Sequence, residues 1–144
     1  MSSPILQDLA RFIAFINTAD PTLGAEVISE SAIFHVPFGT SPLKGLDGYL
    51  QIVGMMRAAF PDIQWTLQET ICEGDKVVAR FETKGTHDGS FMGVPPTGKA
   101  ICMSAVNIYR FEEGKVVEER GLPDLFGVLV QIGAMGGGPP PVAG

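Results

Sequence analysis

The first sixty residues carry apolar side chains at helical spacing. Those in residues 5–16 recur every three or four positions after Ser3-Pro4, a serine cap followed by proline in the first turn, and predict an amphipathic helix. Asp20-Pro21 repeats this start signal and predicts a second, shorter helix to residue 28. Residues 32–37 are β-branched and aromatic enough for a short strand. Residues 46–60 predict a third helix, which Pro61 ends.

From residue 63 the apolar period changes from about 3.6 to 2. Residues 63–71 and 76–86 read as strands joined by a turn at 73–75, and residues 100–111 and 115–122 read as a second such pair. A short apolar helix follows from Leu125. The predicted fold class is therefore α+β, with the N-terminal helices packed on the concave face of a curved, mainly antiparallel sheet, a cone-shaped α+β barrel. We expect one domain over residues 1–134 and a Gly/Pro-rich tail over 135–144.

The amino-acid composition predicts a ligand cavity or a subunit interface and limits the kinds of partner. The 144 residues are 45% hydrophobic and only 18% charged, so we expect part of the apolar surface to line a site for a small lipophilic substrate or a subunit interface. A homodimer or higher homo-oligomer is expected. The net charge of −6 without a basic run argues against nucleic acid and anionic membranes as partners. The chain has no apolar run of about 20 residues and no basic start before an apolar segment, which predicts a cytoplasmic protein.

The sequence gives no sign of a metal or cofactor. Cys72 and Cys102 lie in strand-like segments without metal-ligand spacing, and we expect small, buried, apolar side chains rather than a disulfide. The two histidines, His35 and His87, are far apart in the chain. The glycines of residues 93–98 precede a strand and do not form a phosphate-binding loop. No cofactor is predicted.

Asp124 is the strongest candidate for chemistry. It follows Pro123 where the last strand ends among apolar residues, so an inward carboxyl would be partly desolvated, would favour its protonated form and could exchange protons with a substrate. Alternatively, it caps the helix that begins at Leu125. Arg120 lies four residues earlier with the same strand parity. It either pairs with Asp124 or faces solvent and balances the neighbouring glutamates.

Other polar residues have open alternatives. Arg80, in an otherwise apolar run, either reaches into the cone to hold a substrate oxygen or lies on the open face of the sheet. His35 is either a catalytic pocket residue or a hydrogen-bonded structural one, and His87 is a lid group or solvated. Asn107 and Tyr109 share a face and could donate to an oxyanion. The apolar walls, which stability of the core would explain equally well, come from Trp65, Phe34, Tyr49, Phe60, Met56 and Met103.

Several of these segments together resemble a known family. The anchors are Arg80, residues 85–89, 91–99 and 114–118, Asp124 and residues 131–133. With them the chain resembles the SnoaL-like polyketide cyclases, or ester cyclases, of the nuclear transport factor 2-like superfamily, to about residue 134. This resemblance implies that Asp124 is the general acid/base of a cofactor-free intramolecular aldol ring closure of a polyketide ester. Arg120 departs from the family pattern, which often has tryptophan there, and implies a more polar pocket.

The expected function is therefore an enzyme of the polyketide cyclase type. One alternative is a dehydratase or isomerase that uses His35 and Asp124 as a base and acid pair. Another is a non-catalytic binder of small lipophilic molecules, because fold alone does not establish chemistry. Epoxide opening would need two pocket aspartates bridged by arginine, whereas Asp62, Asp75 and Asp88 all fall in predicted turns.

Overall fold

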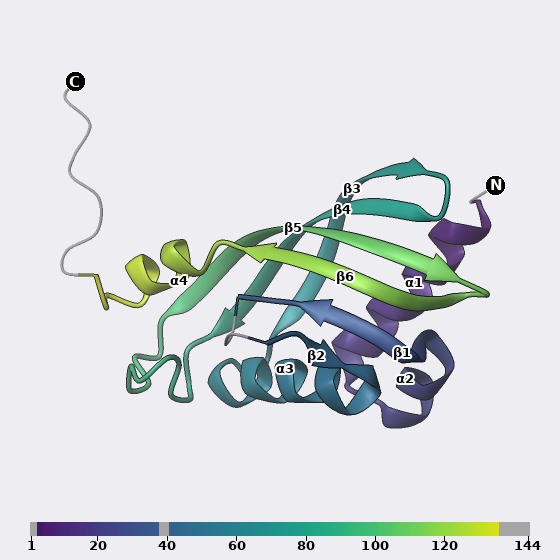
Figure 1. Cartoon of the computed structure of the whole chain (residues 1–144). Coiled ribbons are helices and arrows are strands. Elements are labelled where there is room, and N and C mark those ends of the chain that lie inside the picture. Colours follow the sequence, from purple (N-terminus) through teal and green to yellow (C-terminus); the bar gives the residue numbers. More distant parts are fainter. Residues whose placement is uncertain (1–2, 38–40, 136–144) are drawn as a thin grey trace, which may run out of the picture.

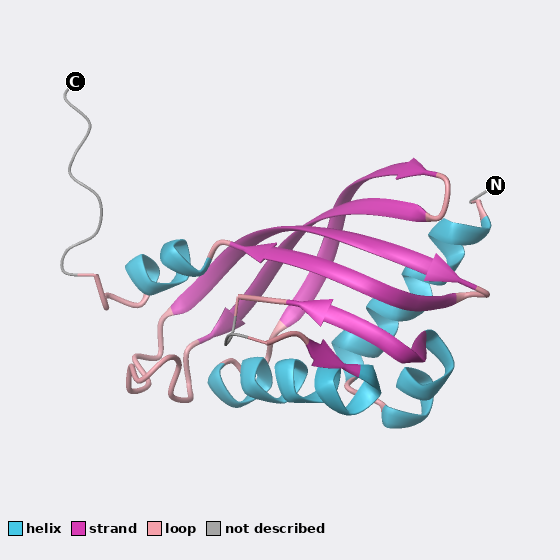
Figure 2. Cartoon of the chain, in the orientation of Figure 1, coloured by secondary structure: helices cyan, strands magenta, loops and turns pink. Residues whose placement is uncertain are grey.

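The computed structural model describes residues 3–37 and 41–135. Among them, six strands form one curved sheet with helices on one face (Figures 1 and 2). The strand order is β2-β1-β6-β5-β4-β3. The strands are β1 (Ile28–His35), β2 (Leu43–Lys44), β3 (Gln64–Glu73), β4 (Lys76–Thr86), β5 (Ala100–Glu112) and β6 (Lys115–Pro123). This is the predicted α+β class, with β1 running parallel to β6 and every other neighbouring pair antiparallel.

Three helices cover one face of the sheet, and a fourth follows its last strand. They are α1 (Pro4–Thr18), α2 (Pro21–Val27), α3 (Gly45–Ala59) and α4 (Leu125–Gln131). The start signals act as expected at α2, where the Asp20 side chain accepts a hydrogen bond of 2.9 Å from the Thr22 backbone N–H. At α1, Ser3 occupies the cap position and Pro4 the first turn, but the serine side chain makes no capping bond.

The sheet differs from the sequence pattern in three places. β1 begins at Ile28 because α2 passes directly into it, and the two-residue β2 was not predicted. In β3, a bulge between Leu67 and Glu69 shifts the register. An extra residue in one strand reverses which face the later side chains take. Leu67 therefore stands opposite Phe81 of the buried face, whereas Ile71 stands opposite Val78 and is exposed.

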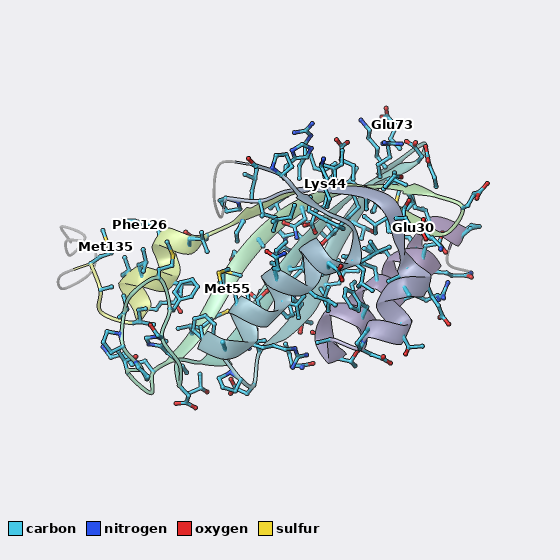
Figure 3. All side chains as sticks on the ribbon, turned by 60° about the horizontal axis from the view of Figure 1, so that its bottom comes forward. Glu30, Lys44, Met55, Glu73, Phe126 and Met135 are labelled. Atoms are coloured by element: carbon cyan, nitrogen blue, oxygen red, sulfur yellow. The ribbon has the colours of Figure 1, made fainter. Side chains whose placement is uncertain are left out.

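Two apolar clusters fill the space between helices and sheet. Figure 3 brings α3 to the front, where its inner side chains and those of the sheet occupy that space. The larger cluster lies under α1 to α3 and includes the rings of Phe12, Phe15, Phe34, Tyr49 and Tyr109. The smaller lies where the end of α3 meets α4 and the loop after β4, and it includes Phe60, Phe91, Met103, Val128 and Ile132. Burial of this area is the main stabilising contribution.

The loop of residues 87–99 is part of this second cluster. His87 is fully buried in it, so the expectation of a lid group or a solvated residue was wrong. The Thr97 backbone N–H donates to His87 Nδ1 over 3.2 Å, and the Thr97 hydroxyl lies 2.9 Å from the same nitrogen. Phe91 packs against the Phe60 ring at 5.1 Å between centroids. The bonds between His87 and Thr97 join the two ends of the loop, and the packing of the His87 and Phe91 rings on Phe60 anchors it to the body.

Cys72 and Cys102 are free and exposed, so the expectation that both are buried was wrong. Cys102 lies opposite Lys84 on the uncovered face, and Cys72 belongs to the end of the β3–β4 hairpin.

On the uncovered face, Ile71, Ile108 and Leu122 are exposed apolar side chains. Self-association stays a prediction. No helix of the described residues is long and apolar enough to cross a membrane. Beyond Met135, the predicted tail lies outside the described residues.

Gly89 lets the loop touch the end of α3. Its backbone N–H donates to the Ala59 carbonyl over 3.0 Å, and a Cβ on Gly89 would lie 1.8 Å from the carbonyl oxygen of Ala58. Because backbone cannot move aside cheaply, we expect Gly89→Ala to lower the free energy of unfolding by about 2–4 kcal/mol. Gly54→Ala is the matched control. Nothing lies within 4 Å of its added Cβ, in the middle of α3, so it should stabilise by about 0.5–1 kcal/mol. Urea unfolding of both variants measures this, and equal midpoints would contradict the close approach.

Candidate active site

A narrow pocket opens between α3 and the β5–β6 part of the sheet, at the end where β6 passes into α4. Figure 1 shows where these elements lie. The space in it that a water molecule can enter is about 50 Å³, and the hollow reaches about 480 Å³ only when open solvent is included. Most of its walls are apolar. It is lined by Val36, Pro37, Tyr49, Ile52, Met56, Trp65, Met103, Ala105, Asn107, Glu119, Gly121, Pro123 and Leu125. Such a lining, with a few polar groups, is typical of sites for small organic molecules.

Glu119 is the ionisable carboxyl group in this lining. It lies on β6 between Phe34 of β1 and Tyr109 of β5 in the sheet register, and it is only 2% exposed. The Tyr49 hydroxyl, from α3, donates to Glu119 Oε1 over 3.3 Å. The Tyr109 hydroxyl also hydrogen bonds to this carboxyl. Two phenols on opposite layers therefore hold the carboxyl group against the concave face.

The surroundings of Glu119 change its acidity. Burial raises its pKa from 4.5 to about 7, and the hydrogen bonds from Tyr109 and Tyr49, which lower it, offset only part of this effect. The pKa values of Tyr49 and Tyr109 are raised well above 10, again chiefly by burial and then by the charge of Glu119. The phenols thus stay protonated while the carboxyl titrates near neutral pH. A group of this kind can act as a general acid or base.

Asn107 and Gly121 shape the pocket next to the carboxyl. The Asn107 side chain donates from Nδ2 to the Tyr109 hydroxyl over 3.0 Å and accepts at Oδ1 from the Leu122 backbone N–H over 3.2 Å. These two bonds fix the amide orientation. A Cβ at Gly121 would lie 3.4 Å from Asn107 Oδ1 and 3.8 Å from Glu119 Oε2. The glycine therefore leaves room for a guest beside both polar side chains.

The structure brings several sequence-predicted residues to this pocket. Asn107, Trp65, Tyr49 and Met103 line it. Tyr109 and Phe34 are buried behind the lining, and the Phe34 ring packs on the Tyr49 ring at 4.6 Å between centroids. Substrate contact by these residues stays a prediction.

The basic candidates lie on the other face of the sheet, so of the two alternatives for each of them the pocket placement was wrong and the ion-paired placement outside the pocket is the observed one. The exposed Arg80 pairs with Glu69 at 2.6 Å. His35 Nε2 and Arg120 Nη2 lie 3.3 Å and 3.5 Å from Glu118 Oε2. In β1, the alternation that buries Phe34 turns His35 outward. The desolvation cost of an unpaired guanidinium favours the same outcome for the arginines.

Asp124 is exposed and lies outside the pocket lining, so the expectation of an enclosed carboxyl was wrong. Its side chain caps α4 by accepting a hydrogen bond of 2.9 Å from the Gly127 backbone N–H. No ion pair joins it to Arg120 within residues 3–37 and 41–135. Its chain neighbours Pro123 and Leu125 do line the pocket, which places Asp124 beside the mouth. Its role in acid–base chemistry stays a prediction.

The sequence interpretation missed Glu119 because the parity of β6 is ambiguous. Val116 and Val117 are both buried, and the register of β6 on β5 shifts at this point. Counting from Val117 puts Glu119 and Gly121 inward, and counting from Val116 puts them outward. The inward pattern Val117, Glu119, Gly121 was the available signal. Among the described residues, no three His, Cys, Asp or Glu side chains come close enough to hold a metal ion.

The raised pKa of Glu119 predicts a pH-dependent stability. The unfolded chain ionises this carboxyl near 4.5 and the folded chain near 7. Between these values the folded state binds more protons, so Glu119 makes the protein less stable as pH rises through this window, by up to about 3 kcal/mol. The difference in unfolding free energy, Glu119→Gln minus wild type, should rise from pH 4.5 to about 7 and then level off. Denaturant unfolding at several pH values measures it, and a flat difference would contradict burial of an uncompensated carboxyl.

Several known proteins with similar sequences and folds are named as cyclases. The family model for SnoaL-like polyketide cyclases matches residues 7–132. The nogalonic acid methyl ester cyclase of Streptomyces nogalater is 34% identical over 91 residues, which cover 62% of this chain and 67% of that protein. The aklanonic acid methyl ester cyclase DauD of Streptomyces sp. strain C5 is 28% identical over 138 residues, or 91% of this chain and 83% of that one.

Two solved structures named as polyketide cyclases have a similar fold. The crystal structure of IdmH, a candidate polyketide cyclase of Streptomyces antibioticus, superposes with a TM-score of 0.81 at 31% identity and covers 92% of this chain and 99% of that one. A candidate polyketide cyclase of Acidithiobacillus ferrooxidans superposes with a TM-score of 0.78 at 27% identity and covers 92% of this chain and 96% of that one. With its sheet, its helical layer and its pocket at the end of β6, this chain belongs to the SnoaL-like polyketide cyclase family.

Proposed function

We propose that this protein is a cyclase that closes a ring in a lipophilic, carbonyl-rich polyketide ester by a cofactor-free intramolecular aldol addition. The observation that supports it most is an apolar pocket with a buried carboxyl group and an oriented amide at its wall. The relatives' names add the substrate class, since these two are cyclases of nogalonic and aklanonic acid methyl esters, and the family model describes polyketide cyclases.

The pocket suits this chemistry for two reasons. Apolar walls hold a flexible carbonyl compound in a folded shape, so that the two reacting carbons meet, and this pre-orientation lowers the entropy cost of ring closure. Exclusion of water also strengthens each hydrogen bond to the developing oxyanion. The Asn107 side-chain amide has two N–H donors and gives one to the Tyr109 hydroxyl, so the second is a donor at the pocket wall.

The reaction is an isomerisation and needs no other reactant. A base removes a proton from the carbon next to one carbonyl, which gives an enolate. The enolate carbon attacks a second carbonyl of the same molecule, a carbon–carbon bond forms, and the electron pair of that carbonyl moves to its oxygen. The oxygen then takes up a proton.

Asp124 is the proposed base, on the strength of the family resemblance and of its position beside the mouth. To reach the substrate, its carboxylate has to leave the Gly127 N–H and turn toward the pocket. This gives up a helix cap, which is typically worth about 1 kcal/mol.

Binding without catalysis is the second candidate function. It is favoured by the capping position of Asp124, which leaves this carboxylate outside the pocket lining. The dehydratase or isomerase alternative lacks such support, because His35 is held by Glu118 on the other face of the sheet.

Conversion of a polyketide ester tests the proposal directly. Purified protein, dialysed against a chelator, should convert nogalonic or aklanonic acid methyl ester into an isomer of unchanged mass, seen by chromatography and mass spectrometry. Gly121→Val should lower the conversion at least tenfold, because its side chain occupies the space beside Glu119. Gly54→Ala, in α3 and away from the pocket, is the control and should convert at the wild-type rate. Saturable binding of both esters without an isomer would favour the binder.

Asp124→Asn tests the base. Asparagine caps a helix as well as aspartate does, so α4 should stay folded and the melting temperature should change little. We expect conversion to fall about 10²- to 10⁴-fold, which is the usual contribution of a general base. Circular dichroism and the rate on the better ester measure the two effects. If the rate of Asp124→Asn stayed within a factor of two of the wild-type rate, Asp124 would act as a helix cap and not as the base.

A further inference from the structure

We propose that Glu119 is a second catalytic residue, the general acid that gives its proton to the oxygen of the attacked carbonyl. This inference rests on the proposed function and divides the reaction between two carboxyl groups. Asp124 at the mouth takes the carbon-bound proton, and Glu119 at the inner wall supplies the oxygen-bound one.

One oxygen of Glu119 lies next to the pocket wall at Gly121. Oε1 accepts from the Tyr49 hydroxyl, whereas Oε2 lies 3.8 Å from the position that a Cβ on Gly121 would take. Gly121 lines the pocket and has no side chain, so a substrate oxygen can approach Oε2 there. Asn107 borders the same space with its Oδ1, 3.4 Å from that Cβ position, while its Nδ2 donates to the Tyr109 hydroxyl.

The neighbours of Glu119 favour a neutral carboxyl. The groups that face it are Tyr49 from α3, Tyr109 from β5, and the apolar Phe34 from β1. Neither phenol is a cation, and both keep their protons near neutral pH. The arginines of this part of the sheet, Arg110 and Arg120, pair with Glu118 on the opposite face. Among the residues that the structure describes, no cationic side chain lies beside Glu119. The buried carboxyl therefore keeps its proton until a stronger base forms in the pocket.

The alkoxide formed by ring closure is such a base. The O–H bond of Glu119 breaks, its electron pair stays on the carboxylate, and the proton forms the new hydroxyl group of the product. The two tyrosine hydroxyls donate to the resulting carboxylate and stabilise it. Asp124, which received the carbon-bound proton, returns it to Glu119 through solvent after the product leaves, so each cycle conserves protons.

Glu119→Gln is the decisive variant, because glutamine has the same shape and can donate a hydrogen bond but cannot release a proton. With the better methyl ester, kcat should fall about 10²- to 10⁴-fold while the Kd of the cyclised product, measured by tryptophan fluorescence of Trp65, stays within about threefold. The matched control is Glu118→Gln. It changes the neighbouring carboxyl on the outer face of the same strand and should keep the wild-type kcat.

Tyr49→Phe provides a readout that a structural role would not move. Activity that needs neutral Glu119 should decline as pH rises through about 7. The Tyr49 hydrogen bond lowers the pKa of Glu119, so its removal should shift this declining limb to higher pH. A Glu119 that merely packs would leave the limb where it is. This variant also decides the matter if Glu119→Gln does not fold.

The outcomes separate this inference from the proposed function. If Glu119→Gln converted the ester as fast as the wild-type protein does, proton donation by Glu119 would be overturned and the cyclase proposal would stand. An unmoved pH limb in Tyr49→Phe would overturn it as well. Wild type that binds both esters and converts neither would overturn both proposals together. A large loss in Glu119→Gln with a shifted limb in Tyr49→Phe would support the inference.

Discussion

The arrangement of the pocket depends on the buried carboxyl group of Glu119. It lies between the sheet and α3 with tyrosine hydroxyls rather than cations beside it. Its burial would be unfavourable if the group had to stay charged, so the surroundings select the neutral form. Tyr49 and Tyr109 reach it from two layers of the fold. Their positions depend in turn on Phe12 and Phe34, whose rings lie 5.2 Å and 4.6 Å from the Tyr49 ring. The aromatic core thus positions the polar group.

Two consecutive glutamates on β6 show how strongly the face of a strand decides chemistry. Glu118 lies on the uncovered face among His35, Arg110 and Arg120, where solvent and ion pairs stabilise its charge. Glu119 lies on the covered face, where burial raises its pKa to about 7. The residue types are identical and the Cα atoms are neighbours. The raised pKa of Glu119 comes from packing, and its burial in the pocket wall makes this residue a candidate for proton transfer.

At the end of the sheet that carries the pocket, the loop of residues 87–99 and helix α4 pack against the sheet and α3. The rings of His87 and Phe91 pack on Phe60 and hold the loop of residues 87–99 against the body, and Gly89 brings it against the end of α3. At α4, Gln131 bonds to both the backbone N–H and the carbonyl of Cys102 on β5. These contacts keep α4, and with it Asp124, next to the pocket mouth. A site at the end of a rigid sheet can therefore carry candidate groups on two separate segments.

The sequence by itself determined the class of fold, because helical and alternating periods, caps and turns are local signals that each segment carries. It also indicated Asn107, Trp65, Tyr49 and Met103, which line the pocket. It did not determine which face of a strand is covered. The helices cover the face opposite to His35, Arg80 and Arg120, so these side chains lie on the outer side. Irregularities in β3 and β6 also interrupt the alternation of inward and outward side chains. Only the tertiary structure placed Glu119 inside and Asp124 on a helix cap, because desolvation depends on what other elements pack against a residue.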